Sequence, residues 1–325
     1  MKVLITTVPF GDKNRYPLDL LKKSNIEYLV NPLNKKLTED ELTEMAVDFD
    51  VIIAGTEPIT KKVMDNAPKL KMISRVGIGL DSVDLLEAEK KGIVVSYTPD
   101  APAPAVAELT IGLMLTLLRL VHVSNMQMHN GQWNRFFGRR LSEVTIGIIG
   151  IGRIGMGVLD HLKGFGSPKI LVNDIKSKRL ENKLNVEWAD KERIYRCADI
   201  ITIHTPLTSQ TKNMIKKDQL LSMKEDAIII NTARGGIINE QSLYQVMQTG
   251  HLSGAAIDVF DFEPYNGKLR EIQRCILTAH MGSMSVDCRT RMEIEATEEA
   301  VRFLTKQPLK GLVPKEEYDV QREGL

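Results

Sequence analysis

The chain has 325 residues, which exceeds the usual size of a single domain, roughly 100 to 200 residues, so two domains with buried cores are expected. Its 43 basic and 42 acidic residues nearly cancel, and its paired lysines are scattered between apolar segments, so no nucleic-acid partner is expected. The three cysteines, Cys197, Cys275 and Cys288, share no metal-binding spacing and leave an odd thiol. This usage indicates a reducing compartment and neither a metal site nor a disulfide framework.

The first apolar run, which follows Lys2, is too short for the hydrophobic region of a signal peptide and lacks a small-residue cleavage site. Residues 105 to 121 are the most membrane-like segment, but Glu108 and Arg119 interrupt them. We therefore expect a cytoplasmic protein with no membrane partner. The segment is predicted to form a long helix buried between domains or subunits.

Short β-branched runs alternate with amphipathic stretches of helical length, which is typical of a parallel sheet flanked by helices. In the first hundred residues the expected strands are KVLITT, IEYLVN, DVIIAG, LKMISRVG and GIVVSYT, with helices near residues 17–23, 39–46, 59–66 and 82–90. This set predicts a small doubly wound α/β domain. The final segment, KEEYDVQREGL, is expected to be a loose tail.

A proline-rich stretch, TPDAPAPAVAE, is a hinge candidate because proline suits the first turn of a helix and disfavours helix just before it. The second series of expected strands is VTIGIIG, KILVND, DIITIHT, AIIINTA, GAAIDVF and CILTAH. The residues at their ends are Gly150, Asp174, His204 to Pro206, Arg234, Asp258 and His280. In open α/β sheets ligands bind outside the carboxyl ends of the strands, so these residues are predicted to build one site.

Residues 150–155 read GIGRIG, directly after an expected strand and at the start of an expected helix. Glycines at Gly150, Gly152 and Gly155 allow a tight turn, a close approach to a pyrophosphate and close packing of helix on strand. The helix N-terminus, at Arg153 and Ile154, supplies amide donors and a positive dipole. The pattern predicts a dinucleotide site; the alternative is a glycine-rich turn without a ligand.

Asp174 closes the next expected strand, close to the spacing of about 20 residues at which an acid binds the ribose hydroxyls of NAD. Its carboxylate would repel a 2′-phosphate, which favours NAD over NADP. Lys176, Lys178 and Arg179 could pair with such a phosphate, but we interpret them mainly as a solvated charge run.

Arg234, Glu263 and His280 form a second constellation, because each follows an expected strand of the nucleotide sheet. An arginine followed by two glycines is a plausible bidentate clamp for a carboxylate. Each residue also has a structural alternative: a surface arginine in a turn, a loop carboxylate before a proline, and a histidine at the edge of a core. The three are informative only together.

Several motifs in order give the chain a resemblance to the D-isomer-specific 2-hydroxyacid dehydrogenase family over nearly its full length. They are SRVGIGLDSVD, PDAPAPAVAELTIGLMLTLLR, GIIGIGRIG, HTPLT, INTARGG, AAIDVFDFEP, TAHMGS and the closing PLKGLVP. Within the family, the RVGIGLDSVD segment and the PDAP run most resemble phosphoglycerate dehydrogenases.

The resemblance implies two doubly wound parallel-sheet α/β domains. A flavodoxin-like substrate-binding domain would comprise residues 1–100 plus 286–325, and a Rossmann NAD-binding domain residues 101–285. The helix at 105–121 looks like the family's dimerisation element, so a homodimer is expected. Because the chain ends soon after PLKGLVP, feedback control by serine through an appended regulatory domain is not expected.

The resemblance also implies the roles of single residues. The family's catalytic arginine, glutamate and histidine fall on Arg234, Glu263 and His280. Further cofactor-binding residues would be Thr205, Pro206, Ala233, Asp258, His280 and Gly282, with Asp258 holding the nicotinamide carboxamide. The substrate would contact Arg75, the amides of Val76 and Gly77, Arg234 and His280. Arg75 resembles a phosphate-binding arginine, and an ion pair beside the substrate loop is its alternative role.

The expected reaction is hydride exchange between NAD and the 2-carbon of a small 2-hydroxy or 2-oxo acid. Arg234 would orient the carboxylate, His280 would give or take the hydroxyl proton, and Glu263 would stabilise the imidazolium. D-3-phosphoglycerate is the expected substrate, with glyoxylate, hydroxypyruvate or a D-lactate-like acid as alternatives. A different class, the NAD-binding corepressors of the family, is disfavoured because Arg234, Glu263 and His280 are all present.

Overall fold

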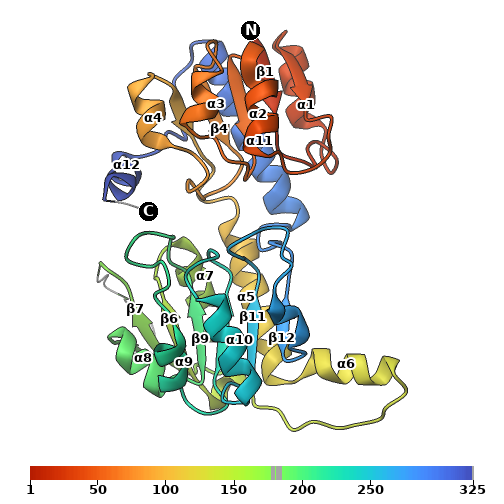
Figure 1. The fold of residues 1–325 in the computed structure, drawn as a ribbon, viewed down its shortest axis with the longest axis vertical. Coiled ribbons are helices and arrows are strands. Elements are labelled where there is room, and N and C mark those ends of the chain that lie inside the picture. Colours follow the sequence, from red (N-terminus) through yellow and green to blue (C-terminus); the bar gives the residue numbers. More distant parts are fainter. Residues whose placement is uncertain (177–179, 181–184, 324–325) are drawn as a thin grey trace. The chain divides into compact units, whose positions relative to one another are not determined.

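The computed structural model describes residues 1–176, 180 and 185–323, and the chain divides into two compact units. Unit 1 consists of Met1–Pro102 and Met284–Leu325, and unit 2 consists of Ala103–Ser283. The α/β class predicted from the alternating strand and helix patterns is confirmed in both units, since each contains a fully parallel sheet with helices packed against it (Figure 1).

Unit 1 is built on a five-stranded parallel sheet in the order β2-β1-β3-β4-β5. Its strands are β1 (Lys2–Ile5), β2 (Glu27–Val30), β3 (Val51–Ala54), β4 (Met72–Arg75) and β5 (Val94–Ser96). Its helices are α1 (Tyr16–Lys23), α2 (Glu39–Met45), η1 (Ala46–Asp48), α3 (Lys61–Asp65), α4 (Leu85–Lys90), α11 (Val286–Leu304) and α12 (Lys315–Arg322). All five strands predicted for the first hundred residues are present.

Alternate residues of these strands bury their side chains on opposite faces of the sheet, as the pleat of a strand requires. Leu4 and Ile52 face a cluster that includes residues of α2, α3 and α4, whereas Val3 and Ile53 face one that includes residues of α1 and α11. A helix from the C-terminal part of the chain therefore covers one face of a sheet built from the N-terminal part.

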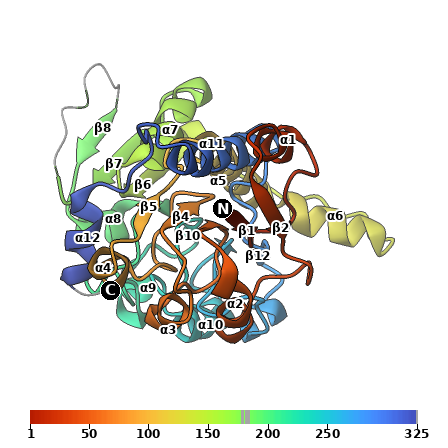
Figure 2. The ribbon, with the colours of Figure 1, turned by 90° about the horizontal axis from the view of Figure 1, so that it is seen from above.

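The segment after residue 314 was expected to be a loose tail, and that expectation is wrong. Lys315–Arg322 form α12, which lies beside α4 (Figure 2). Tyr318 packs against the core cluster, and Arg322 is paired with Glu89 of α4 at 2.6 Å. A polar helix of eight residues is marginal by itself, so its stability comes from contacts that the local sequence does not reveal.

Unit 2 is built on a seven-stranded parallel sheet in the order β12-β11-β10-β9-β6-β7-β8. Its strands are β6 (Thr145–Ile149), β7 (Lys169–Asn173), β8 (Val186–Trp188), β9 (Ile200–Ile203), β10 (Ile228–Asn231), β11 (Gly254–Ile257) and β12 (Cys275–Leu277). Its helices are α5 (Ala103–Leu118), α6 (Val121–His129), η2 (Leu141–Glu143), α7 (Arg153–Leu162), η3 (Lys163–Phe165), α8 (Lys191–Cys197), α9 (Lys217–Ser222), α10 (Glu240–Thr249) and η4 (Lys268–Glu271). The edge strand β8 was not predicted.

The long helix predicted at 105–121 is α5, which ends at Leu118. Leu120 then adopts a left-handed backbone with φ +52° and begins a second helix in a new direction. α5 packs on α7 and against the sheet within unit 2, which explains its apolar composition. No single helix of the described residues is long and apolar enough to cross a membrane. α5 and α6 taken together have the length and composition of a membrane span, but the pair is bent by 64°.

Candidate active site

All strands of unit 2 are parallel, so their carboxyl ends share one edge of the sheet. β6 lies between β7 and β9, which places the reversal of strand order between β6 and β9. Ligands bind at such a switch point in doubly wound sheets. The residues that follow β6 and β9, Gly150 and His204, meet there in direct backbone contact.

The three glycines of the turn after β6 have different surroundings. A Cβ atom on Gly150, where φ is +99°, would lie 2.4 Å from the carbonyl oxygen of His204. One on Gly155 would lie 2.0 Å from the carbonyl oxygen of Gly150, whereas one on Gly152 would meet nothing within 4 Å. The first and third glycines therefore serve backbone packing, and the second leaves open space at the N-terminus of α7.

The open space beside Gly152 is where the sequence motif predicts the pyrophosphate of a dinucleotide. Arg153 and Ile154 begin α7, where backbone N–H groups have no carbonyl acceptor one turn earlier in the helix. A helix of ten residues also directs the positive end of its dipole there.

Asp174 follows β7 and is held beside the same turn. Its carboxylate accepts hydrogen bonds from the backbone N–H groups of Ile151, at 2.7 Å, and Lys176, at 3.1 Å. The acid is thus fixed where the ribose of a dinucleotide would lie. Lys178 and Arg179, the other members of the predicted charge run, lie outside the described residues.

His280 and Glu263 form a hydrogen-bonded pair. Nδ1 of His280 lies 2.9 Å and 3.0 Å from the two carboxylate oxygens of Glu263, and both side chains are partly exposed, at 36% and 23%. Glu263 also accepts a hydrogen bond from the backbone of Phe260 at 3.2 Å. The bond at Nδ1 fixes the ring orientation and leaves Nε2 as the nitrogen that can exchange a proton with a ligand.

Asp258, at the end of β11, organises the turn that carries His280. It is 1% exposed, and its carboxylate accepts hydrogen bonds from Thr278 Oγ1 at 2.6 Å and from the N–H groups of Met281 and Gly282, both at 2.9 Å. Its carbonyl accepts from the N–H of His280 at 2.8 Å. Burial raises the pKa of Asp258, and these hydrogen bonds oppose the rise.

His280 itself has φ +48°, a left-handed conformation that most side chains disfavour. The bonds from Asp258 stabilise that conformation. Sequence analysis assigned Asp258 to the carboxamide of the cofactor and overlooked Thr278, whose hydroxyl is distant in sequence from its acceptor. In the structure the carboxylate already binds three donors of the His280 turn.

Arg234 follows β10 in a loop whose residues are hydrogen-bonded to one another. Its Nη1 donates to the carbonyl of Ala233 at 2.6 Å, and Asn231 bonds both the N–H of Ala233 and the carbonyl of Arg234. A Cβ on Gly235 would lie 2.1 Å from the backbone of Phe260. The Arg234 loop therefore packs directly against the loop that carries Glu263.

The residues after β9 are polar and partly enclosed. Nε2 of His204 lies 3.0 Å from Thr202 Oγ1, while Nδ1 is fully buried and has no partner within the described part of the chain. Burial lowers the pKa of His204 to about 3. Thr205 places its N–H against Gly150, so Thr205 and Pro206 flank the glycine turn.

Of the predicted substrate residues, Arg75, Val76 and Gly77 lie in unit 1, where neighbouring groups of the protein bind them by hydrogen bonds. Arg75 is 4% exposed and donates to the carbonyls of Val76, at 2.8 Å, and Ala54, at 3.4 Å. The N–H of Val76 donates to Ala54, and that of Gly77 donates to Thr98 Oγ1 at 2.8 Å. Thr98, which sequence analysis overlooked, also donates its N–H to the Gly77 carbonyl at 3.1 Å.

Among the residues that the structure describes, no group of three or more His, Cys, Asp or Glu side chains is arranged to hold a metal ion. In unit 2 the parallel sheet, the open glycine turn at its switch point and the histidine–carboxylate pair on the same edge are features expected of a nicotinamide-dependent dehydrogenase domain.

Comparison with known proteins gives the same class. Residues 111–282 match the NAD binding domain of the D-isomer specific 2-hydroxyacid dehydrogenases. The chain belongs to this family, as the sequence motifs predicted, and NAD is its cofactor.

Relatives divide between two substrate groups. The chain is 39% identical over 259 residues to a D-3-phosphoglycerate dehydrogenase of Methanocaldococcus jannaschii, covering 78% of this chain but only 49% of that protein. It is 34% identical over 298 residues to a hydroxypyruvate reductase of Thermotoga maritima, covering 88% of this chain and 96% of that protein. It therefore spans about half the length of the first relative and nearly all of the second.

Solved structures share the fold. A protein of Thermus thermophilus is 31% identical with a TM-score of 0.89, covering 97% of this chain and 100% of that one. The NAD-dependent formate dehydrogenase of Staphylococcus aureus, solved in complex with NAD, is 28% identical with a TM-score of 0.84, covering 97% and 99%.

Proposed function

We propose that the protein is a D-3-phosphoglycerate dehydrogenase-like enzyme, which interconverts D-3-phosphoglycerate and its 2-oxo acid with NAD. The coarser activity, NAD-dependent oxidation and reduction of D-2-hydroxy and 2-oxo acids, follows from the family. The hydrogen bond between His280 Nδ1 and Glu263 supports the acid–base step of this reaction, because it provides an oriented proton-transfer group on the NAD-binding unit. The 39% identity to a phosphoglycerate dehydrogenase supports the substrate.

The cofactor would be held by groups at the switch point of unit 2. Gly152 and the first amides of α7 would bind the pyrophosphate, and Asp174 the adenosine ribose. Bound NAD supplies the acceptor or donor of the hydride. Thr205, Pro206 and Ala233 would line the same edge, next to the glycine turn and the Arg234 loop.

His280 would move the proton of the substrate hydroxyl. With Nδ1 bonded to Glu263, Nε2 gives the proton to the forming hydroxyl during reduction and takes it back during oxidation. Glu263 keeps the ring in one orientation and stabilises the imidazolium. Asp258 and Thr278 fix the turn, so the position of Nε2 does not depend on the side chain of His280 alone.

Arg234 would bind the substrate carboxylate through its guanidinium, a geometry that suits a planar anion. In unit 1, Val76 and Gly77 stay predicted carboxylate ligands, and their amides would exchange or share the acceptors that they have in this structure. The inward-facing Arg75 shapes this loop through the carbonyls of Ala54 and Val76.

A second candidate is reduction of glyoxylate or hydroxypyruvate. Two observations favour it: the relative matched over 96% of its length is a hydroxypyruvate reductase, and the guanidinium of Arg75 is buried against its own backbone. The phosphate group of a phosphorylated substrate would need a basic side chain that extends to it. The two candidates share His280, Glu263 and Arg234 and differ only in what binds the far end of the substrate.

The test is NADH oxidation with 3-phosphohydroxypyruvate, hydroxypyruvate, glyoxylate and pyruvate, each at saturating NADH. A kcat/KM for 3-phosphohydroxypyruvate at least about tenfold above the others supports the proposal, since a well-placed charged hydrogen bond contributes that much. Higher kcat/KM for glyoxylate or hydroxypyruvate replaces it with the second candidate. Tight NADH binding without turnover of any acid would favour a corepressor-like binding protein.

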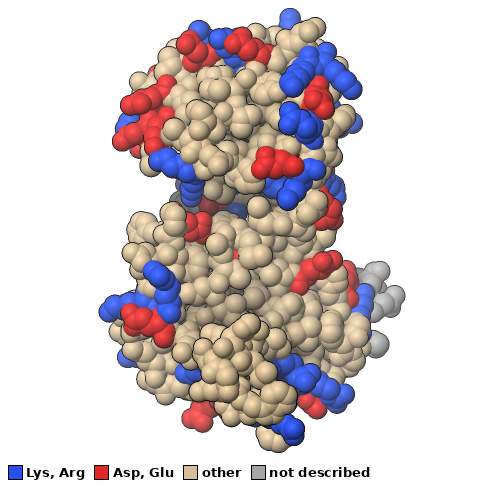
Figure 3. Space-filling view, turned by 90° about the vertical axis from the view of Figure 1, so that its right-hand side faces the viewer, with Lys and Arg blue, Asp and Glu red and all other residues tan. Residues whose placement is uncertain are grey.

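We also propose that the protein is a homodimer joined through residues 121–138 of unit 2, an arm that consists of α6 and the segment after it. α6 has no buried residue, and the arm exposes Trp133 (75%) and Phe137 (103%). Figure 3 shows a broad area of the surface of unit 2 that is free of charged side chains. Exposed aromatic side chains such as these mark a protein contact, and in a two-fold dimer the same surface of each chain faces the other.

Light scattering tests the dimer. Phe137→Glu should give the mass of one chain, whereas Leu221→Glu, at an exposed apolar residue of α9 (44%), should keep the mass of two. A native mass of one chain would contradict the dimer. The cytoplasmic location stays a prediction.

A further inference from the structure

The C-terminal helix α12 contacts the turn that follows the proposed substrate loop. The side-chain amide of Gln321 donates to the carbonyls of Val83, at 2.7 Å, and Leu80, at 3.3 Å, and its oxygen accepts from the N–H of Leu85 at 2.9 Å. One side chain of α12 thus binds three backbone groups of residues 80–85.

The N–H of Leu85 needs such a partner, whereas the carbonyl of Leu80 also accepts from the N–H of Val83 at 3.0 Å. Leu85 is the first residue of α4, and the first N–H groups of a helix have no acceptor within it. Only a side chain that both donates and accepts can bond the amide and the carbonyls together, and glutamine does so without charge. The chemistry of the contact is therefore specific to Gln321.

The turn continues directly from the substrate loop. Gly77 is held on one side by the two hydrogen bonds to Thr98, and Leu80 is anchored in the core, 7% exposed. Residues 78 and 79 connect these two anchors. A displacement of residues 80–85 must therefore move the loop or strain its backbone.

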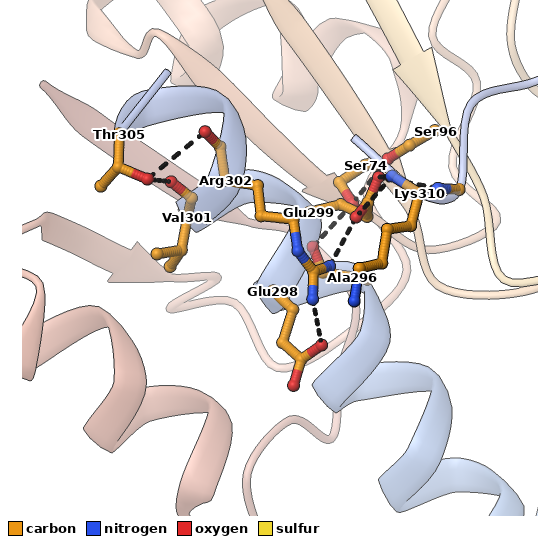
Figure 4. Close-up of polar contacts among 10 residues, drawn as sticks. Ser74, Ser96, Ala296, Glu298, Glu299, Val301, Arg302, Thr305 and Lys310 are labelled. Atoms are coloured by element: carbon orange, nitrogen blue, oxygen red, sulfur yellow. Dashed lines mark hydrogen bonds and ion pairs between the residues drawn. The ribbon is translucent and has the colours of Figure 1, made fainter. Parts of the chain in front are cut away.

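α12 is itself firmly attached to unit 1. The segment before it is fixed by Glu299 of α11, which is 3% exposed and accepts hydrogen bonds from the N–H groups of Lys310 and Gly311, both at 2.9 Å. Figure 4 shows this contact beside the bond of Ser74, on β4, to the carbonyl of Ala296. The helix that covers the sheet thus holds both β4 and the segment that leads to α12.

We propose that Gln321 is a positioning residue that sets the affinity for the 2-oxo acid by fixing the substrate loop from the side of α4. This inference rests on the proposed function, in which Val76 and Gly77 bind the substrate carboxylate. In this proposal Gln321 acts through the backbone of residues 80–85, so its loss changes binding of the acid and not proton transfer.

The test compares three variants. Gln321→Ala removes all three hydrogen bonds, and Gln321→Glu keeps the acceptor but loses both donors. Arg322→Ala, the matched control, loses only exposed ion pairs of α12 with Glu89 and Asp319. Both Gln321 variants should raise KM for the 2-oxo acid about tenfold with kcat and the Kd for NADH unchanged, the signature of lost uniform binding. Arg322→Ala should leave KM unchanged.

An unchanged KM in Gln321→Ala, or an equal rise in Arg322→Ala, would overturn the proposal and leave α12 a stabilising helix. Hydrogen exchange at residues 76–85 gives a readout that needs no activity: it should accelerate in both Gln321 variants and not in the control. If the native protein reduces no 2-oxo acid, the proposed function fails, and exchange alone then decides whether Gln321 holds the loop. Unchanged exchange would reject the inference in either case.

Discussion

The carboxyl edges of the two sheets are organised differently. In unit 2, side chains bond across neighbouring strands, as in the His280–Glu263 pair and the Asp258 carboxylate, and the turn at Gly152 is open. In unit 1, the backbone groups of the loop after β4 are bonded by the protein itself, at Ala54 and Thr98. At this edge unit 2 therefore carries oriented side chains, whereas unit 1 carries a backbone loop whose conformation depends on hydrogen bonds from neighbouring residues.

The largest expected effect is the loss of His280. His280→Asn should lower kcat at least about 10²-fold, the lower end of general acid–base contributions, without abolishing NADH binding. Asparagine is chosen because it tolerates the positive φ of this position. His161→Asn, on an exposed site of α7, is the control. Turnover near the native rate would exclude His280 as the acid–base group.

The glycine turn can be tested by a pair of variants that separate binding from folding. Gly152→Val fills space that is open in this structure, so it should weaken NADH binding at least about tenfold by blocking approach to the amides of α7, with little change in stability. Gly155→Ala should lower the free energy of unfolding by about 1–3 kcal/mol, because its Cβ meets the Gly150 carbonyl. Fluorescence titration and urea unfolding measure the two effects. Equal behaviour of the two variants would contradict the assignment.

Asp258→Asn tests whether the His280 turn depends on its acceptor. The amide offers one acceptor oxygen where the carboxylate binds three donors, so the turn should loosen and kcat should fall about tenfold. Burial raises the pKa of Asp258, so the charged form costs free energy at neutral pH. Removing the charge offsets the lost bonds, and the unfolding midpoint should change little. A fall in stability with full activity would refute this role.

The smallest expected effect concerns His204. Its pKa is about 3 when folded and about 6.5 when unfolded, so the neutral ring contributes stability above pH 6.5 that is lost as the pH falls. Between pH 7 and pH 5.5 the native protein should lose about 1 kcal/mol more of unfolding free energy than His204→Gln. Urea unfolding at the two pH values measures this. Parallel pH dependence in the two proteins would show that the ring is not held neutral.

The parts that could be predicted from sequence are those whose signal is local. Runs of β-branched residues predicted the strands of both sheets except β8. The GIGRIG motif predicted the turn at the switch point, where a side chain on Gly150 or Gly155 would meet the carbonyl of His204 or of Gly150. The pairing of His280 with Glu263 came from the family resemblance. Their roles stay predictions.

The parts that could not be predicted depend on partners distant in sequence. Thr278, Thr98 and Gln321 are polar residues of ordinary type, and only the folded chain brings them to Asp258, Gly77 and the turn before α4. α12 was missed for the same reason, since its eight residues are strongly polar on average and none of them is fully buried. Such contacts belong to tertiary structure and leave no local pattern.

The discontinuity of unit 1 has a consequence for synthesis of the chain. The sheet face that includes Val3 and Ile53 is covered in part by Met292 and Ala296 of α11, which are translated only after the whole of unit 2. Translation proceeds at about 5–20 residues per second, so this face of the sheet stays uncovered for roughly 10 to 40 s before α11 is synthesised. Unit 2, which is continuous, can fold during this interval. The nascent N-terminal sheet therefore exposes this apolar face until α11 is synthesised.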